Sequence, residues 1–263
     1  MVEIELCLDK SVEQNASIYF EQAKKLRKKM QGAKGAIAVH QKKLIELEKK
    51  KNLEKEEYTK GKEKKVESKH EWYEKFRWFI SSEDFLVVGG RDATTNEIII
   101  KKHTDKNDMV FHTDIAGSPF FVIKRGDKEI GLETIKEVAD ATVTFSRVFQ
   151  LGHSNSPVFW VKPEQVTKEA PTGEYLTKGA FMIKGKTNYI DNKISLAIGK
   201  LSDGRLMAGP VDAVKKHCSE YLELIQGDNK ISQIAKKIKA KLGGEIDDII
   251  RILPTGGMEI SKS

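Results

Sequence analysis

Apolar side chains recur at alternating spacings of four and three along the first fifty residues. The positions are Val12, Ala16, Tyr19, Ala23, Leu26, Met30, Ala33, Ile37, His40, Leu44 and Leu47. This heptad pattern predicts one long helix with a single apolar seam, and Asp9 or Ser11 is expected to cap its start. Residues 2–7 alternate like a short isolated strand, from which we expect that an upstream domain has been removed.

Residues 49–65 are almost entirely charged, and they predict a turn or a frayed tip at the end of this rod. Beyond them, Val66, His70, Tyr73 and Arg77 follow at heptad-like spacing. We therefore expect a long antiparallel coiled-coil hairpin whose second leg leads into a globular half. A coiled coil between two copies of the chain, that is a homodimer, is the alternative.

From residue 85 onwards the pattern changes to short apolar runs bounded by turn residues, which is typical of strands. The expected strands are 85–90, 97–102, 109–113, 120–124, 157–161 and 179–184, and residues 132–149 carry a helical pattern. Residues 92–96 are expected to be the turn between the first two strands. This succession predicts an α+β fold, with a largely antiparallel mixed sheet and packed helices.

The last seventy residues resemble a small α/β extension. We expect a hairpin over residues 202–204, a helix from Pro210 to Gly227, and a second helix capped by Asp228. A short helix at 247–253 and a strand at 258–260 complete the chain. The predicted domains are a coiled-coil region at 1–75, a central domain at 76–192 and the extension at 193–263.

The chain carries a net charge of +7, and 32% of its residues are charged. A basic protein of this kind attracts phosphate polymers or acidic membrane surfaces. Its apolar runs are much shorter than the roughly 18 residues of a membrane span, so no span is expected. Cys7 and Cys218 form no CxxC pair, which argues against a disulfide framework and favours free thiols in a reducing cytoplasm.

The sequence contains neither a GxxxxGK[ST] loop nor a dinucleotide-binding glycine motif. His112 and Asp114, with Asp92, offer a metal site or an acid–base pair as one alternative. No further ligand stands at a persuasive spacing, so we expect His112 and Asp114 to organise the loop 115–118 by hydrogen bonds. The polar group as a whole is Asp92, Asn96, Glu97, His112 and Asp114. We expect no cofactor, no metal and no catalysis.

Cations and aromatic rings gather in the central domain, at strand ends and in loops. The expected RNA-binding residues are Arg77, Arg91, Lys101, Lys102, Lys124, Lys162, Lys168, Tyr175, Lys178, Lys184 and Lys186. Lysines hold phosphates and rings stack on bases, so this combination suits a flexible nucleic acid. Trp78, Phe79 and Trp160 fit a core better than a stacking platform, whereas Tyr175 lies in a glycine-containing loop.

Five short blocks in a fixed order identify a family resemblance. They are WYEKFRWFI at 72–80, GGRD at 89–92, NE at 96–97, FHTD at 111–114 and APTGEYL at 170–176. Together they resemble the NFACT-R domain of the NFACT family, over residues 71–188. The heptad rod looks like the middle coiled coil of that family, and the tail from residue 194 looks like the extension of its archaeal-type members.

The resemblance implies an RNA-binding module in ribosome-associated quality control. Members of the family bind large ribosomal subunits obstructed by peptidyl-tRNA, recruit tRNA and promote C-terminal tailing of stalled chains. The coiled coil would reach stalk-region proteins or quality-control partners. The sequence has no counterpart of the N-terminal NFACT-N domain, so tailing by this chain alone is not expected. A DNA-binding sensor is the alternative, because small coiled-coil NFACT-R proteins have been linked to extracellular DNA.

Overall fold

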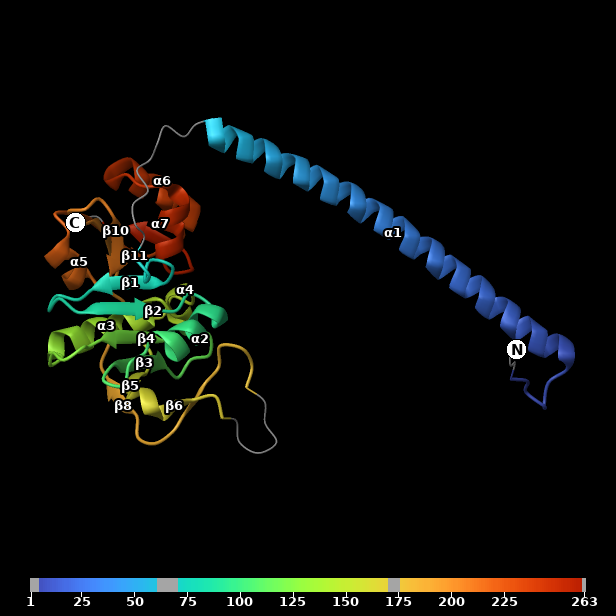
Figure 1. Cartoon of the computed structure of the whole chain (residues 1–263), viewed down its shortest axis with the longest axis horizontal. Coiled ribbons are helices and arrows are strands. Elements are labelled where there is room, and N and C mark those ends of the chain that lie inside the picture. Colours follow the sequence, from blue (N-terminus) through green and yellow to red (C-terminus); the bar gives the residue numbers. More distant parts are fainter. Residues whose placement is uncertain (1–4, 61–70, 170–175, 262–263) are drawn as a thin grey trace. The chain divides into compact units, whose positions relative to one another are not determined.

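The computed structural model describes residues 5–60, 71–169 and 176–261, and it divides the chain into two compact units, Met1–Lys69 and His70–Ser263 (Figure 1). The domain limits expected from the sequence therefore stay predictions. The helices are α1 Val12–Lys60, α2 Ala93–Lys102, α3 Leu132–Thr144, α4 Arg147–Gln150, α5 Val211–His217, α6 Ile231–Leu242 and α7 Ile246–Ile252, with a 3-10 helix at Pro163–Gln165. The strands are β1 Arg77–Ile80, β2 Leu86–Gly89, β3 Met109–Thr113, β4 Phe121–Lys124, β5 Val158–Val161, β6 Val166–Thr167, β7 Met182–Ile183, β8 Asn188–Ile190, β9 Ala197–Lys200, β10 Leu206–Gly209, β11 Glu220–Gln226 and β12 Met258–Ile260.

The first unit contains the long helix α1, as the heptad pattern predicts. Ser11 caps it: its Oγ accepts a hydrogen bond from the Gln14 backbone N–H (3.3 Å), and Gln14 Oε1 accepts one from the Ser11 N–H (3.0 Å). This reciprocal arrangement is a capping box. Of the strand expected at 2–7, residues 2–4 lie outside the described part of the chain, and residues 5–7 form no strand.

The helical hairpin expected here is replaced, in the described residues, by one helix. Residues 49–60, where a turn was expected, continue α1. Residues 61–70 lie outside the described part, and of the expected second leg Tyr73 lies in a turn and Arg77 in β1. The seam stays open to solvent, with Leu26 65% and Leu44 58% exposed. Pairing with a second copy remains a prediction.

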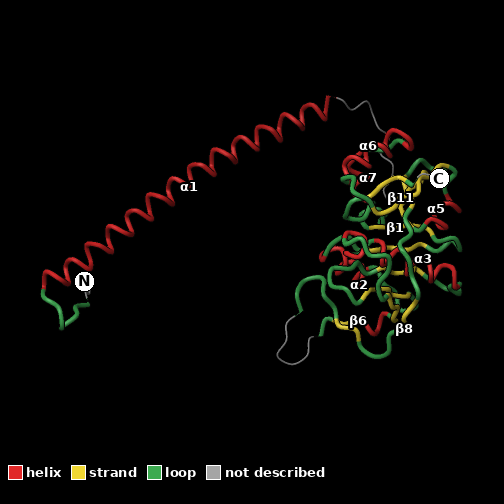
Figure 2. The backbone as a smooth tube through the Cα atoms, turned by 180° about the vertical axis from the view of Figure 1, so that it is seen from behind, coloured by secondary structure: helices red, strands yellow, loops and turns green. Residues whose placement is uncertain are grey.

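The second unit is an α+β fold, as predicted. Within the described residues, six strands form an antiparallel sheet in the order β1-β2-β4-β3-β5-β8, and four form a second sheet in the order β10-β9-β11-β12. A separate short pair joins β6 and β7. Figure 2 shows the second sheet with α6 and α7 next to β1, at one end of the larger sheet.

Both faces of the larger sheet are buried. Successive side chains of a strand point to opposite sides, and each side packs into its own apolar cluster. Phe121 belongs to the cluster that includes α3, and its neighbour Phe120 belongs to the cluster that includes Ile99 of α2. Val87 and Val88 divide in the same way. This explains why the strands appear in the sequence as nearly continuous apolar runs.

The strand expected at 97–102 is wrong, because residues 93–102 form the helix α2. Asp92 accepts a hydrogen bond from the Thr95 backbone N–H (2.8 Å), and the Asp92 N–H donates to Thr95 Oγ1 (2.9 Å). The run of isoleucines at 98–100 favours a strand by propensity. The capping box at the start and the packing of Ile99 under the sheet overrule that preference.

The second sheet shares one core with the larger sheet. Met207 of β10 and Phe79 of β1 are fully buried in the same cluster, and the Ile80 backbone N–H donates to Met207 Sδ (3.3 Å). Gly209 lies so close that a Cβ atom there would be 2.9 Å from the Phe79 ring. The two sheets are therefore packed as one body.

Sequence predictions for the last seventy residues are largely confirmed, with one exception. The hairpin over 202–204, α6, α7 and β12 are present. The helix expected from Pro210 to Gly227 ends at His217, because residues 220–226 form β11 between β9 and β12. The cap expected from Asp228 is also wrong, since α6 starts after Lys230 with Gln233 as its partner.

Asp140 of α3 holds the segment between β8 and β9, and it predicts a pH effect on stability. Its Oδ1 accepts a hydrogen bond from the Lys193 backbone N–H (2.9 Å), and burial, with Asp212 nearby, raises the pKa of Asp140 to about 6 from 3.8. Between those two pH values the folded state keeps a proton that the unfolded chain has lost. Stability therefore falls as the pH rises through this interval.

We expect Asp140→Asn to make that fall less steep, because the amide keeps the acceptor oxygen and cannot ionise. The measurement is the melting temperature of both proteins by circular dichroism at pH 4 and pH 7. Glu137, whose pKa is also raised by burial, contributes in the same direction in both proteins. Identical pH dependence of the two proteins would contradict the assignment.

Candidate nucleic-acid interface

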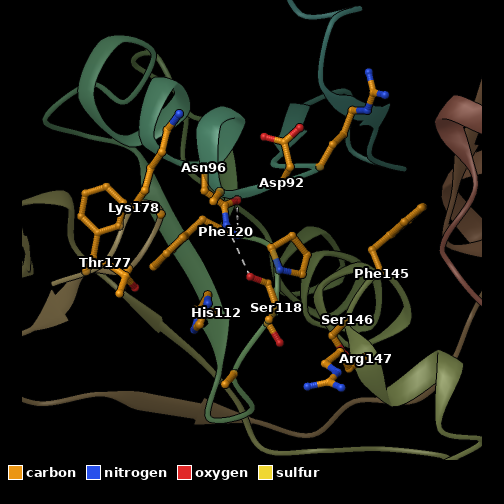
Figure 3. A pocket seen from close by; sticks show the side chains of 18 of the residues that line it. Asp92, Asn96, His112, Ser118, Phe120, Phe145, Ser146, Arg147, Thr177 and Lys178 are labelled. Carbon is orange, nitrogen blue, oxygen red and sulfur yellow. Dashed lines mark hydrogen bonds between the residues drawn. The ribbon is translucent and has the colours of Figure 1, made fainter. Parts of the chain in front are cut away.

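A cleft of about 550 Å³ lies in the second unit, beside the start of α2. Its walls come from the β3–β4 loop, the junction of α3 and α4, and the segment 177–181. Figure 3 shows Lys178, Asp92 and Arg147 spaced around it. Its lining also includes Phe120, Pro119 and Phe181, so rings lie in the same cleft as the charged groups.

Two glycines beside the cleft, Gly89 and Gly90, let the backbone at the end of β2 pack closely against neighbouring side chains. A Cβ atom on Gly90 would lie 1.7 Å from Asn96 Oδ1, which accepts a hydrogen bond from the Phe120 N–H (3.2 Å). A Cβ atom on Gly89 would lie 2.3 Å from the Phe121 ring. Buried Asn96 therefore fixes the start of β4 against α2.

Gly179 makes a similar contact on the other wall. It has a φ of +81°, a conformation that L side chains rarely adopt, and a Cβ atom there would lie 2.5 Å from Ala93 Cα. The segment that carries Lys178 thus lies directly on the first turn of α2. Any larger residue at this position would push the wall away from the helix.

Three exposed cations form the rim of the cleft, and each comes from a different segment. Arg91 precedes α2, Arg147 begins α4, and Lys178 lies in the segment beside Ala93. Arg91 donates to the Lys75 carbonyl (3.3 Å), and partial burial and Arg251 lower its pKa. No ion pair with a carboxylate is found for these three within the residues that the structure describes.

Arg77 also lines the cleft, but its side chain is buried. Its Nη1 donates to the Gly90 carbonyl (2.9 Å), and its guanidinium lies 5.1 Å from the Phe145 ring centroid. Burial, with Arg91 nearby, lowers the pKa of Arg77 to about 10. Arg77 is therefore a buried cation behind the rim and not an exposed phosphate ligand.

The polar residues proposed as an alternative site are separated by their contacts. His112 stacks on Phe120 with ring centroids 4.1 Å apart, and burial lowers its pKa, which favours the neutral imidazole. Asp114 is exposed and accepts a hydrogen bond from Tyr189 Oη (3.3 Å), whereas Asp92 caps α2. Among the described residues, no group of three or more His, Cys, Asp or Glu is placed to hold a metal ion.

The loop 115–118 is organised mainly by Thr113. Its Oγ1 accepts a hydrogen bond from the Ile115 N–H (3.1 Å) and bonds to the Ser118 hydroxyl. Hydrogen bonds with the backbone of Ser118 and Thr113 partly oppose the pKa shift of His112. The organising role expected of His112 and Asp114 stays a prediction, and the hydrogen bonds to this loop made by Thr113 were not expected from the sequence.

The other predicted RNA-binding residues lie outside the cleft lining. Lys124 is held by Asp105 (2.7 Å), Asp108 and the His103 carbonyl, and Lys168 is held by Glu97. Lys184 pairs with Glu169. The exposed remainder consists of Lys101, Lys102, Lys162 and Lys186. Tyr175 lies outside the described residues.

Arg147 is a cleft residue that the sequence analysis did not find. The sequence pattern predicted one helix over 132–149, whereas α3 ends at Thr144 and Ser146 caps a separate α4, its Oγ accepting from the Val148 N–H (3.1 Å). The break brings Arg147 to the cleft, where its Cδ would be 3.1 Å from a Cβ atom on Gly117. The serine before Arg147 was the available signal.

Comparison with known proteins places this cleft in a known domain. Residues 75–185 match the NFACT protein RNA binding domain. The chain is 42% identical over 206 residues to the archaeal Rqc2 homolog aRqcH of Methanocaldococcus jannaschii, covering 76% of this chain and 31% of that protein. It is 44% identical over 120 residues to the human ribosome quality control complex subunit NEMF, covering 45% of this chain and 11% of that protein.

The chain thus spans about a third of the archaeal relative and about a tenth of the human one. The C-terminal part of the fibronectin/fibrinogen-binding protein from Streptococcus suis aligns with a TM-score of 0.38 and 19% identity, over 70% of this chain and 77% of that one. That likeness is too weak to support a statement about fold. The domain match and the sequence relatives agree, and the chain belongs to the NFACT family.

Proposed function

We propose that this chain binds RNA through the rim of the cleft and serves in ribosome quality control. The observation that carries the proposal is the position of Arg91, Arg147 and Lys178 around one cleft inside the matched domain. Exposed cations without carboxylate partners among the described residues are free to neutralise phosphates. The exposed Lys101, Lys102, Lys162 and Lys186 would extend the contact along the backbone of the RNA.

The names of the relatives supply the cellular context of this proposal. Two of them are a ribosome quality control subunit and an Rqc2 homolog, so the proposed RNA is rRNA of the large subunit or tRNA. Docking on subunits that carry peptidyl-tRNA, and support for C-terminal tailing, are the finer roles that the resemblance implies. We propose binding rather than catalysis, in the cytoplasm. No helix of the described residues is long and apolar enough to cross a membrane.

Helix α1 is proposed as an arm that contacts proteins. It is 49 residues long, which corresponds to roughly 70 Å at 1.5 Å per residue. Its exposed seam, including Leu26 and Ile37, is the kind of surface that packs against another helix. The proposed partners are stalk-region proteins, other quality-control factors or a second copy of the chain.

The test is a titration of fluorescently labelled tRNA with the full chain at several salt concentrations. If roughly three to seven phosphates are neutralised, the logarithm of the affinity should fall against the logarithm of salt with a slope of about −2 to −5. Co-sedimentation with purified large ribosomal subunits extends the same measurement to rRNA. Absent or salt-independent binding contradicts the proposal, and displacement of tRNA by equimolar duplex DNA would favour the DNA-binding alternative.

A further inference from the structure

We propose that the cleft receives a single unpaired nucleotide of an RNA, with the base inside and its phosphates on the rim. This inference rests on the proposed function and specifies the form of RNA. A surface that only follows a phosphate backbone needs no enclosed space. The volume of about 550 Å³ lies instead in the ~300–1,000 Å³ range of sites that enclose a small molecule.

The interior of the cleft suits a flat ring. Phe181 is half-buried, and it meets Phe120 edge to face with centroids 5.4 Å apart. The Lys168 ammonium lies 4.7 Å from the centroid of Phe181, which leaves a ring in contact with both a cation and apolar atoms. Unstacked RNA bases are held by aromatic side chains of this kind. His112 adds no charge to this interior while its imidazole is neutral.

The cations at the rim are placed to bind the phosphates of the nucleotide. Arg91, Arg147 and Lys178 approach the opening from three segments, and no carboxylate pairs with them within the described ranges. By contrast, Lys124 and Lys168 of the same domain are each held by a carboxylate. The three cations that form no ion pair among the described residues therefore line the same cleft as Phe120 and Phe181.

Asp92 sets the orientation of the nucleotide. Its carboxylate lies at the start of α2, where hydrogen bonds from Thr95 lower its pKa and keep it ionised. A negative charge at this point repels a phosphate from the wall of α2, while it accepts a hydrogen bond from an amino group or a ribose hydroxyl. The phosphates stay with the cations, and the base takes the inner position.

The test compares RNA hairpins that differ at one position. The first carries a single bulged adenosine, the second an abasic residue in the same bulge, and the third is fully paired. We expect the full chain to bind the bulged adenosine about tenfold more tightly than the other two, because one stacked base contributes on the order of that factor. Competition by free AMP is measured alongside, and we expect the bulged hairpin to resist displacement by AMP at equal concentration.

Phe181→Leu should remove the preference for the bulged adenosine while the affinity for the paired hairpin stays the same. The matched control is Tyr189→Leu, which removes an exposed ring of β8 outside the cleft and should keep the preference. Circular dichroism confirms that both variants are folded. Equal binding of all three hairpins overturns the insertion and leaves RNA binding standing, whereas no binding of any hairpin overturns both. Displacement by equimolar AMP would show a free-nucleotide site and also overturns the insertion.

Discussion

Phe121→Ala is expected to lower the free energy of unfolding of the second unit by about 3–5 kcal/mol. The side chain is fully buried in β4, with its ring centroid 6.4 Å from that of Phe79 and 5.8 Å from that of Phe145. On one side the ring packs directly against Gly89 of the neighbouring strand. Glycine has no side chain that could move into the space left by the ring, so only a backbone shift could fill it. The cavity would thus persist at the centre of the sheet, and its cost is a large part of a typical domain stability of ~5–15 kcal/mol.

Urea unfolding followed by tryptophan fluorescence measures this loss. Tyr189→Ala is the matched control, because Tyr189 is an aromatic residue of the same sheet that is 58% exposed. We expect that control to change the stability by less than about 1 kcal/mol. A Phe121→Ala protein as stable as the control would mean that the core is not packed around this ring.

Reversal of two rim charges, Arg147→Glu with Lys178→Glu, should weaken tRNA binding by about tenfold or more at 0.15 M salt. Each side chain is exposed at the rim, so the change removes two phosphate contacts and introduces repulsion. The salt slope should fall by roughly 1.4 in magnitude, since each contact with a single strand accounts for about 0.7. Fluorescence anisotropy at several salt concentrations gives both quantities.

The matched control is Lys200→Glu with Lys215→Glu. Both lysines are exposed, both lie outside the cleft lining, and the pair changes the net charge by the same amount. A control that weakens binding as much as the rim pair would show that overall charge, and not the cleft, holds the RNA. Unchanged binding in the rim variant would reject the cleft itself.

Sequence patterns predicted the parts of the fold that local periodicity determines. The heptad seam gave α1, and the apolar runs at 109–113 and 120–124 gave β3 and β4 to within one residue. The hairpin over 202–204 follows from its turn residues. These elements need no information from distant parts of the chain.

The wrong predictions concern segments whose structure depends on partners elsewhere. Residues 97–102 have strand propensity, but a cap five residues earlier and the underside of the sheet make them helical. Residues 220–226 complete a sheet whose other strands lie at 197–200 and 258–260, so their conformation depends on pairing. Neither contact is visible in a local window of the sequence.

The sequence predicted a basic nucleic-acid site in this domain, but only some of the residues that line the cleft. Arg91, Lys178, Asp92 and Asn96 were named from the sequence and do meet at one cleft. Charge alone could not separate these residues from Lys124, which is as basic but is held by two carboxylates. Arg147 was missed because its position depends on the break between α3 and α4.

Cooperativity follows from the packing of β1 beside β10. The matched domain ends at residue 185, yet Phe79 meets Gly209, and the Ser81 carbonyl lies 2.8 Å from His217 Nε2. If a protease removed the residues after 185, β1 would lose its contacts with β10 and α5, and aromatic side chains such as Phe79 would be exposed to water. We therefore expect the tail to unfold together with the matched domain, whereas α1 belongs to a separate compact unit.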